Sequence, residues 1–425
     1  METYGRILLI AMPVFLGLVL FEKWYGWRRG KDTVRNMDMI SSLSSGITNV
    51  TKDVLKLSIG IIGYSWMVEH MAIFHIRNTI LTYVIAFIVL DFQGYWVHRW
   101  SHHINFFWNR HIIHHSSEEF NLACALRQSI SSFIELFTFL LLPAALIGVP
   151  VQVIAVIAPL HLFAQFWYHT QHIKKMGFLE KIIVTPSHHR VHHAINPEYL
   201  DKNLSQIFIF WDKWFGTFQE ELPDKPCVYG ITRPAATWNP IKINFQHIWL
   251  LAKDAWRTNS WWDKVRIWFM PTGWRPQDVN EKYPVYKIEN VYDFQKYDPK
   301  SSKGLIAWSW IQITVVLLLI SYFFGSIAKI GSPGMFIYGG FIFLYVYSFT
   351  ELMDRNPYAV IWESLKNILG IAIILRQGDW FGADQMLPGI SMIILAYFII
   401  ATVVSGYFSY RFIKEDRQLS PVLES

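Results

Sequence analysis

The chain has 425 residues, of which 52% are hydrophobic, 17% are aromatic and only 16% are charged. Soluble domains carry about a quarter charged residues, so this composition excludes an ordinary water-soluble protein and favours an integral membrane class. The net charge is +6, but the basic residues gather beside apolar runs, which is typical of membrane borders and argues against nucleic acid as a partner. The two cysteines, Cys124 and Cys227, are too few for a disulfide framework.

Apolar runs of membrane-spanning length recur along the chain, since a helix needs about 20 apolar residues to cross the hydrocarbon. They predict an all-α integral membrane protein with about nine transmembrane helices, near 5–21, 54–74, 79–97, 129–148, 150–168, 304–324, 334–350, 358–375 and 387–408. The stretch 129–168 has an alternative interpretation, a single hairpin that does not fully cross.

The runs divide the chain into three expected segments. N-terminal membrane helices occupy 1–78, a catalytic region with a membrane hairpin and a polar cap occupies 79–303, and a C-terminal membrane bundle occupies 304–425. The segment after the first run is rich in Lys and Arg, which predicts that it is cytoplasmic. Alternation then places the cap on the cytoplasmic side, in the endoplasmic reticulum of a eukaryote or the inner membrane of a bacterium.

Histidines form the strongest chemical signal in the sequence. Most of the sixteen gather in three short groups, which are His98, His102 and His103, then His111, His114 and His115, then His188, His189, His192 and His193. On a helix, residues three or four positions apart face the same way, with Cβ atoms about 5–6 Å apart. His98 can therefore share a metal with His102, and His111 can do so with His114 or His115. The third group repeats this pattern, pairing His189 with His192 or His193.

The number of imidazoles predicts two metal ions, because one ion cannot use eight or more ligands. Imidazole suits zinc, copper, iron and nickel alike. The absence of cysteine ligands disfavours an iron–sulfur or structural zinc site, and a redox-active iron pair best explains a site that apolar chains can reach. A single histidine at a membrane border is usually an interfacial or hydrogen-bonded residue, but three groups at one membrane face favour ligation.

A metal transporter is the alternative from another class of protein. A transporter would place its histidines along a path through the spans, often in repeated halves. Here the histidines gather at one membrane edge, and the segment 304–425 contains none. The pattern therefore favours an enzyme.

Asp91 lies within the predicted helix over 79–97, where a carboxylate is costly and usually functional. It shares a helical face with His98 and His102, but it lies about 10 Å from His98 along the helix axis. We expect it to support the catalytic site by accepting the free N–H of a histidine from another group. Packing between helices is the competing interpretation.

Three histidine boxes divided by a membrane hairpin resemble the fatty acid hydroxylase/sterol desaturase superfamily. Within it, the chain is similar to the alkylglycerol monooxygenase family. The similarity runs through Asp91–His102, His111–Glu118, Asn121–Ser129, Gln165–Thr170, Thr185–His193, Trp211–Phe218 and Tyr229–Thr232, together with the extra C-terminal spans.

The resemblance implies an O2-dependent diiron monooxygenase that acts on a lipid from the bilayer, with ether lipids as the substrate. The metal ligands it implies are His98, His102, His111, His114, His115, His169, His189, His192 and His193, with His188 as a further candidate. His103 stands where that family has a glutamate associated with tetrahydrobiopterin. The resemblance thus leaves two electron sources, tetrahydrobiopterin or an electron-donor protein. The alternative function is hydroxylation or desaturation of a sterol or fatty acyl chain.

Overall fold

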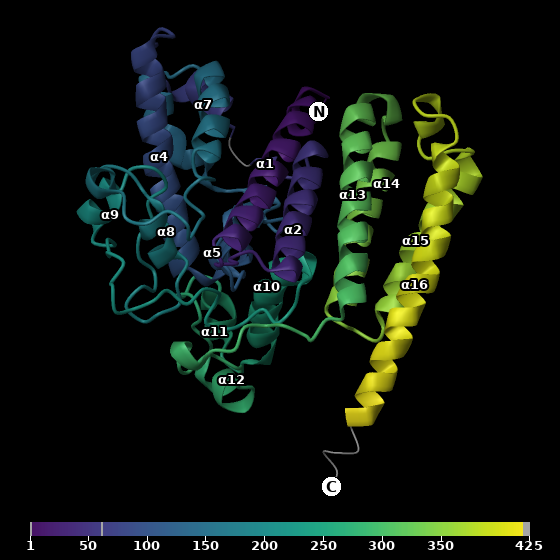
Figure 1. Cartoon of the computed structure of the whole chain (residues 1–425). Helices are drawn as coiled ribbons and strands as arrows, with labels where there is room; N and C mark the ends of the chain where they lie inside the picture. Colours follow the sequence, from purple (N-terminus) through teal and green to yellow (C-terminus); the bar gives the residue numbers. More distant parts are fainter. Residues whose placement is uncertain (1, 61–62, 420–425) are drawn as a thin grey trace.

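The computed structural model describes residues 2–60 and 63–419, and it is almost entirely helical (Figure 1). Long helices stand roughly side by side, and short helices form a cap at one end of them. The only sheet in the described part of the chain pairs β1 (Ile59–Gly60) with β2 (Ile134–Glu135) in parallel. The expectation of a mainly helical protein is confirmed.

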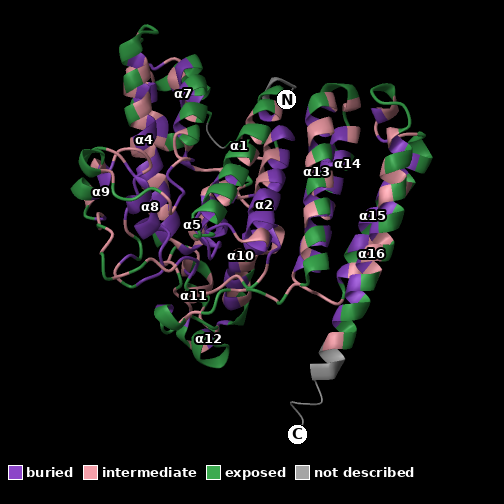
Figure 2. Cartoon of the chain, in the orientation of Figure 1, coloured by how far each residue is buried: buried purple, intermediate pink, exposed green. Residues whose placement is uncertain are grey.

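Five helices are long and apolar enough to cross a membrane, by length and composition. They are α1 (Glu2–Arg28), α4 (Ile80–His103), α13 (Lys303–Ile330), α14 (Gly334–Met353) and α16 (Ile390–Leu419). Each coincides with one of the predicted spans. Exposed residues occur along these helices (green in Figure 2), and they include large apolar side chains such as Ile10, Leu81 and Leu318, as expected of lipid-facing surfaces.

Three other predicted spans are broken into shorter elements. In its described residues the run at 54–74 contains β1 and the short helix α3 (Tyr64–Met71), and the run at 129–148 contains β2, η2 (Phe137–Leu141) and α6 (Leu142–Ile147). The run at 150–168 contains α7 (Val151–Phe163), of 13 residues. At 1.5 Å per residue α7 is about 20 Å long, which is shorter than the roughly 30 Å of hydrocarbon. This geometry agrees with the alternative of a hairpin that does not fully cross, and nine spans are not confirmed.

The remaining predicted span, α15 (Ala359–Gln377), is long enough but carries a buried ion pair. Lys366 Nζ lies 3.0 Å from Glu363 Oε1, and both side chains are fully buried. Gln312 of α13 and Ser405 of α16 donate hydrogen bonds to the other oxygen of Glu363. The charges are tolerated because they are paired and hydrogen-bonded, and they connect three helices of the C-terminal bundle.

The N-terminal helices and the C-terminal bundle share one apolar core. Met39, Ile40, Leu43 and Ile47 of α2 (Asn36–Val54) pack in it with residues of α13 and α14. Gly339 of α14 makes this close approach possible, because a Cβ there would lie 2.3 Å from Leu55. Helix α2 is thereby fixed between the bundle and the cap, while the expected division at 78 and 303 stays a prediction.

The cap grows out of the end of α4. Helix α5 (Asn105–His115) begins two residues after α4 ends, and α10 (Pro240–Arg257) packs along it. The other helices of the cap are short, namely η1 (Leu122–Leu126), η3 (Gly177–Lys181), α8 (Pro186–His192), α9 (Phe210–Phe215), α11 (Trp261–Arg266), α12 (Gln277–Lys282) and η4 (Val291–Asp293). Figure 2 shows that buried residues gather where α4, α5 and α8 meet, which is where the histidines lie.

The ion pair of α15 provides a test of the bundle. We expect Lys366→Met to lower stability by about 3–5 kcal/mol, because it leaves the Glu363 carboxylate buried without a counter-charge. The double variant Lys366→Met/Glu363→Gln should recover most of the loss, since it removes both charges. Thermal unfolding in detergent measures both effects. A double variant no more stable than the single one would contradict this account.

Candidate metal centre

Nine histidines form two groups in which one ring nitrogen per residue lies within 4.8 Å of all the others. The first group contains His98, His102, His111, His115 and His192. The second group contains His114, His169, His189 and His193. The structure thus brings together nine of the ten predicted metal ligands, and it divides them five and four.

The helical geometry of the boxes explains this division. Adjacent residues on a helix point about 100° apart, since there are 3.6 residues per turn. His114 and His115 therefore face different groups, and His192 and His193 do the same. The sequence left open whether His111 pairs with His114 or with His115, and the structure selects the four-residue spacing. The rings of His115 and His193 stack with centroids 4.4 Å apart, so the two groups are in contact.

The distances between ring nitrogens match those expected around a metal ion. The Nε2 atoms of His98 and His111 lie 2.9 Å apart, and those of His111 and His115 lie 3.0 Å apart. In the second group, Nε2 of His189 lies 2.9 Å from His169 and 3.0 Å from His193. Metal–nitrogen bonds of about 2.0–2.1 Å place neighbouring ligand nitrogens about 2.8–3.4 Å apart, for angles between 90° and tetrahedral.

The tautomers of several rings can be assigned from the hydrogen bond at Nδ1, the ring nitrogen that points away from the group. Nδ1 of His98 lies 2.7 Å from the Leu204 carbonyl oxygen, and Nδ1 of His192 lies 3.0 Å from that of Lys202. Nδ1 of His169 lies 3.0 Å from the Gln165 carbonyl. A carbonyl oxygen only accepts, so each Nδ1 carries the proton and each Nε2 presents a lone pair.

Converging lone pairs repel one another unless a cation lies between them. Among the described residues, the buried Nε2 atoms of His102 and His192 have no hydrogen-bond partner, although unpartnered buried polar atoms are costly. Burial and the neighbouring rings also hold the pKa of His193 well below its usual value, so this ring is neutral, as ligation requires. The donor set therefore fits two metal ions.

One short loop orients three histidines of the first group. Its carbonyls at Lys202 and Leu204 bind His192 and His98, as above, and Oδ1 of Asp201 lies 3.0 Å from Nδ1 of His102. Asp201 and Asn203 adopt left-handed backbone conformations, with φ of 56° and 53°. Such a conformation is uncommon for residues other than glycine, and Asn and Asp tolerate it best.

Buried side chains hold this orienting loop, residues 201–204, in place. The Asn203 amide donates to the carbonyls of His188 and Gln219, at 3.0 and 2.8 Å. The Asp212 carboxylate accepts from the backbone N–H of Leu204, at 2.7 Å. Sequence reasoning missed these residues because they have no histidine spacing. The only signal was chemical, namely that ligand histidines need acceptors for their second N–H.

Asp91 lies outside both histidine groups. Its carboxylate lies 2.8 Å from Nε2 of His161 in α7 and accepts the backbone N–H groups of Ile207 and Phe208. It also accepts the indole N–H of Trp211, at 2.8 Å. The histidine that Asp91 contacts, His161, belongs to neither group, so the expected support of a histidine from another group is not among its contacts. Its observed contacts connect α4, α7 and the loop before α9.

His188 and His103 also lie outside the groups. Nδ1 of His188 lies 3.4 Å from the backbone N–H of Thr185, so the side chain caps the start of α8. Residue 103 is exposed, and its Nδ1 lies 2.8 Å from the Arg99 carbonyl. Neither side chain contributes a nitrogen to the two groups, and only His188 is buried.

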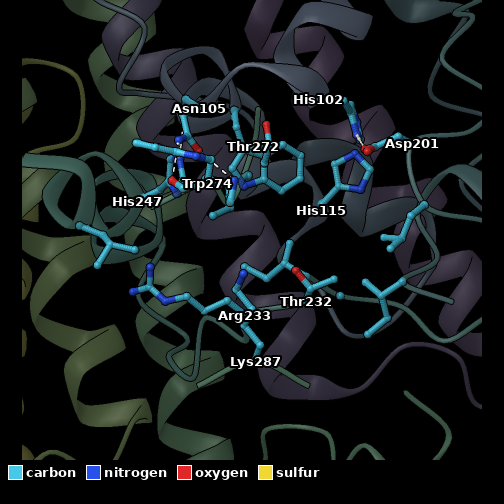
Figure 3. Close-up of a pocket in the computed structure, with 18 of the residues that line it drawn as sticks. His102, Asn105, His115, Asp201, Thr232, Arg233, His247, Thr272, Trp274 and Lys287 are labelled. Atoms are coloured by element: carbon cyan, nitrogen blue, oxygen red, sulfur yellow. Dashed lines mark hydrogen bonds and ion pairs between the residues drawn. The ribbon is translucent and has the colours of Figure 1, made fainter. Parts of the chain in front are cut away.

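Aromatic side chains and a cavity flank the two groups. Tyr168 and Phe120 pack on the second group, with centroids 4.3 Å from His189 and 5.2 Å from His193. Beside the first group lies a cavity of about 220 Å³, which His102 and His115 line (Figure 3). Its walls also contain apolar residues such as Leu250 of α10. Three histidines of the first group line the cavity, namely His102, His115 and His192, and His193 of the second group also does, so a ligand inside it would lie mainly against the first group.

The fold and the site define a class, the helical membrane proteins whose cap holds a paired histidine site. The fatty acid hydroxylase family matches residues 83–217, which contain both histidine groups. The alkylglycerol monooxygenase of Homo sapiens is 32% identical over 411 residues, covering 95% of this chain and 89% of the relative. The Xenopus tropicalis enzyme of the same name is 30% identical over 93% of this chain and 87% of the relative.

The chain belongs to the alkylglycerol monooxygenase family. A shorter match reaches the ornithine lipid hydroxylase OlsE of Rhizobium tropici, 28% identical over 36% of this chain and 46% of that protein. No solved structure matches the chain. Family membership confirms the resemblance found in the sequence and establishes an oxygen-dependent monooxygenase.

The orienting loop provides a test of the centre. Asp201→Ala removes the acceptor of His102 Nδ1, and loss of such a partner typically lowers metal affinity by about 10–100-fold. We expect the variant to release iron at a correspondingly lower chelator concentration, measured by elemental analysis after dialysis. Asp224→Ala, which removes an exposed carboxylate of the cap, is the matched control. Equal iron retention in the two variants would show that Asp201 does not support the site.

Proposed function

We propose that the chain is a diiron monooxygenase that uses O2 to oxidise and cleave ether lipids of the alkylglycerol class. The observation that carries the proposal is the pair of histidine groups, five and four, in a member of this family. Acceptors on the second ring nitrogens and unpartnered Nε2 atoms support metal binding at both groups.

One iron would be held by His98, His102, His111, His115 and His192, and the other by His114, His169, His189 and His193. Iron, when bound, supplies the redox chemistry that activates O2 for attack on a lipid C–H bond. His188 and Asp91 are proposed to hold the surrounding elements in position, because neither contributes to the two groups. The cap, which holds both histidine groups, and the apolar core shared by the N-terminal helices and the C-terminal bundle would act together as one enzyme.

The protein's own residues fix the ligands and control access. The loop at 201–204 keeps the Nδ1 protons of His98, His102 and His192 engaged, so that their Nε2 lone pairs stay directed inward. Tyr168 and Phe120 pack against rings of the second group and cover part of it. The cavity beside the first group would receive the reacting part of the lipid.

The chemistry follows from hydroxylation at the carbon next to the ether oxygen. One oxygen atom of O2 enters this C–H bond, and the other leaves as water after taking up two electrons and two protons. The product is a hemiacetal, which breaks its C–O bond to give a fatty aldehyde and a free glycerol hydroxyl. Tetrahydrobiopterin or an electron-donor protein would supply the electrons.

We propose that the cap faces the cytoplasm, in the endoplasmic reticulum membrane of a eukaryote or the inner membrane of a bacterium. Basic residues support this orientation, because cytoplasmic loops carry an excess of Lys and Arg. The end of α1 with Arg28, and the end of α16 with Lys414, lie on the same side as the cap (Figure 1).

Metal analysis tests the two-ion proposal. Purified protein should contain close to two irons per chain. His115→Ala and His189→Ala should each lose iron, because each removes one ligand from a different group. His70→Ala, which removes an exposed histidine of α3, should keep the full content. A single metal ion in a fully active protein would refute the diiron proposal.

Substrate assays test the ether-lipid assignment. Membranes containing the protein should release fatty aldehyde from a 1-O-alkylglycerol, and His115→Ala should abolish the release because the first metal is lost. A sterol and a ceramide serve as competing substrates, since related enzymes act on other lipids. Each incubation is run with and without tetrahydrobiopterin, which separates the two electron sources. Oxidation of the sterol or the ceramide instead would assign the alternative function.

A further inference from the structure

The cavity beside the first histidine group has a cationic end that the proposed reaction leaves unused. Arg233 and Lys287 line it. A hydrogen bond from the Ile288 N–H to the Thr232 carbonyl, at 2.9 Å, brings their two segments together. In Figure 3 both cations lie on the side of the cavity opposite His102 and His115. The cavity therefore joins a metal site to a pair of positive charges.

These two charges have no counter-ion within the described part of the chain. Neither Arg233 nor Lys287 makes an ion pair or side-chain hydrogen bond there. A third cation, Arg275, also lines the cavity, but its guanidinium binds both oxygens of Asp254, at 2.6 and 3.0 Å. Asp201 is the only acid among the described lining residues, and His102 already engages it.

The surroundings of Arg233 are unfavourable for a cation. The side chain is partly buried, and burial together with the nearby Arg275 lowers its pKa, which Asp254, already bound by Arg275, only partly offsets. Burial also lowers the pKa of His247, on the cavity wall, to about 4, so this ring is neutral near pH 7. A recess lined by uncompensated charges of one sign concentrates the field and attracts the opposite charge. An anion at this end would relieve the repulsion among the cations.

We propose that Arg233 and Lys287 bind a phosphate group at the outer end of this cavity. Arginine recognises phosphate through paired N–H donors, and lysine adds a point charge. The inference rests on the proposed function for its substrate class, an ether lipid that carries phosphate on its glycerol. Oxidation next to the ether oxygen brings the glycerol end of the lipid into the cavity beside the first group, and these cations line the opposite side of the same cavity.

Binding measurements in neutral detergent test the proposal on the full chain. The probes are a 1-O-hexadecylglycerol, the same lipid with a 3-phosphate, and inorganic phosphate, each titrated by calorimetry. The wild type should bind the phosphate-bearing lipid at least about tenfold more tightly than the neutral lipid, which corresponds to about 1.4 kcal/mol. Arg233→Gln and Lys287→Gln should each reduce this ratio towards one, while Arg233→Lys should keep part of it.

A control variant and a comparison with inorganic phosphate make the experiment specific. Lys174→Gln removes an exposed cation of the cap outside the cavity and should preserve the ratio. Inorganic phosphate that binds as tightly as the lipid phosphate supports the anion site and assigns a free anion to it. A wild type without preference, or an unchanged ratio in Arg233→Gln, would overturn the proposal. Binding does not require turnover, so a protein that binds phosphate without cleaving ether lipid fails only the proposed function.

Discussion

The convergence of nine imidazole nitrogens is the constraint on which the rest of the structure depends. Each converging Nε2 must lack a proton in order to bind a metal, and most of the rings are buried. A neutral ring carries its single proton on either Nδ1 or Nε2. An acceptor beside Nδ1 holds the proton there and leaves Nε2 unprotonated. The carbonyls of Lys202, Leu204 and Gln165 provide this control through the backbone. The cap is therefore folded around acceptors as much as around histidines.

That requirement explains why an irregular loop carries so much of the centre. A regular helix or strand uses its own carbonyls in its hydrogen-bond ladder, so these cannot orient a side chain from elsewhere. The loop at 201–204 frees two carbonyls by taking left-handed turns at Asp201 and Asn203. Such turns persist only where the surroundings over-determine them. The Asn203 amide and the Asp212 carboxylate provide the necessary hydrogen bonds.

The sequence predicted the ligands better than their surroundings. Histidine spacing depends on local helix geometry, which a single sequence encodes, and nine of the ten predicted ligands meet in two groups. His188 was the exception, because a residue in the first turn of a helix can cap the backbone instead. The spans were harder to predict, since hydropathy does not reveal that the apolar run at 150–168 forms a helix of only 13 residues. The role of the orienting loop at 201–204 could not be predicted from the sequence, because it depends on contacts between segments about a hundred residues apart.

The membrane bundle without histidines also contributes to the metal centre. Helix α2 packs on α13 and α14, and its Asp38 binds Arg127 at 2.9 Å, with both side chains buried. Arg127 in turn donates to Ser116, at 2.8 Å, and Ser116 binds the carbonyl of Ile113 in the last turn of α5. This turn carries His114 and His115, one ligand of each group. Buried charged contacts hold their geometry firmly because breaking one leaves an uncompensated charge. The bundle thus fixes the point at which the two groups meet, which explains how a distant membrane segment can support a site to which it contributes no ligand.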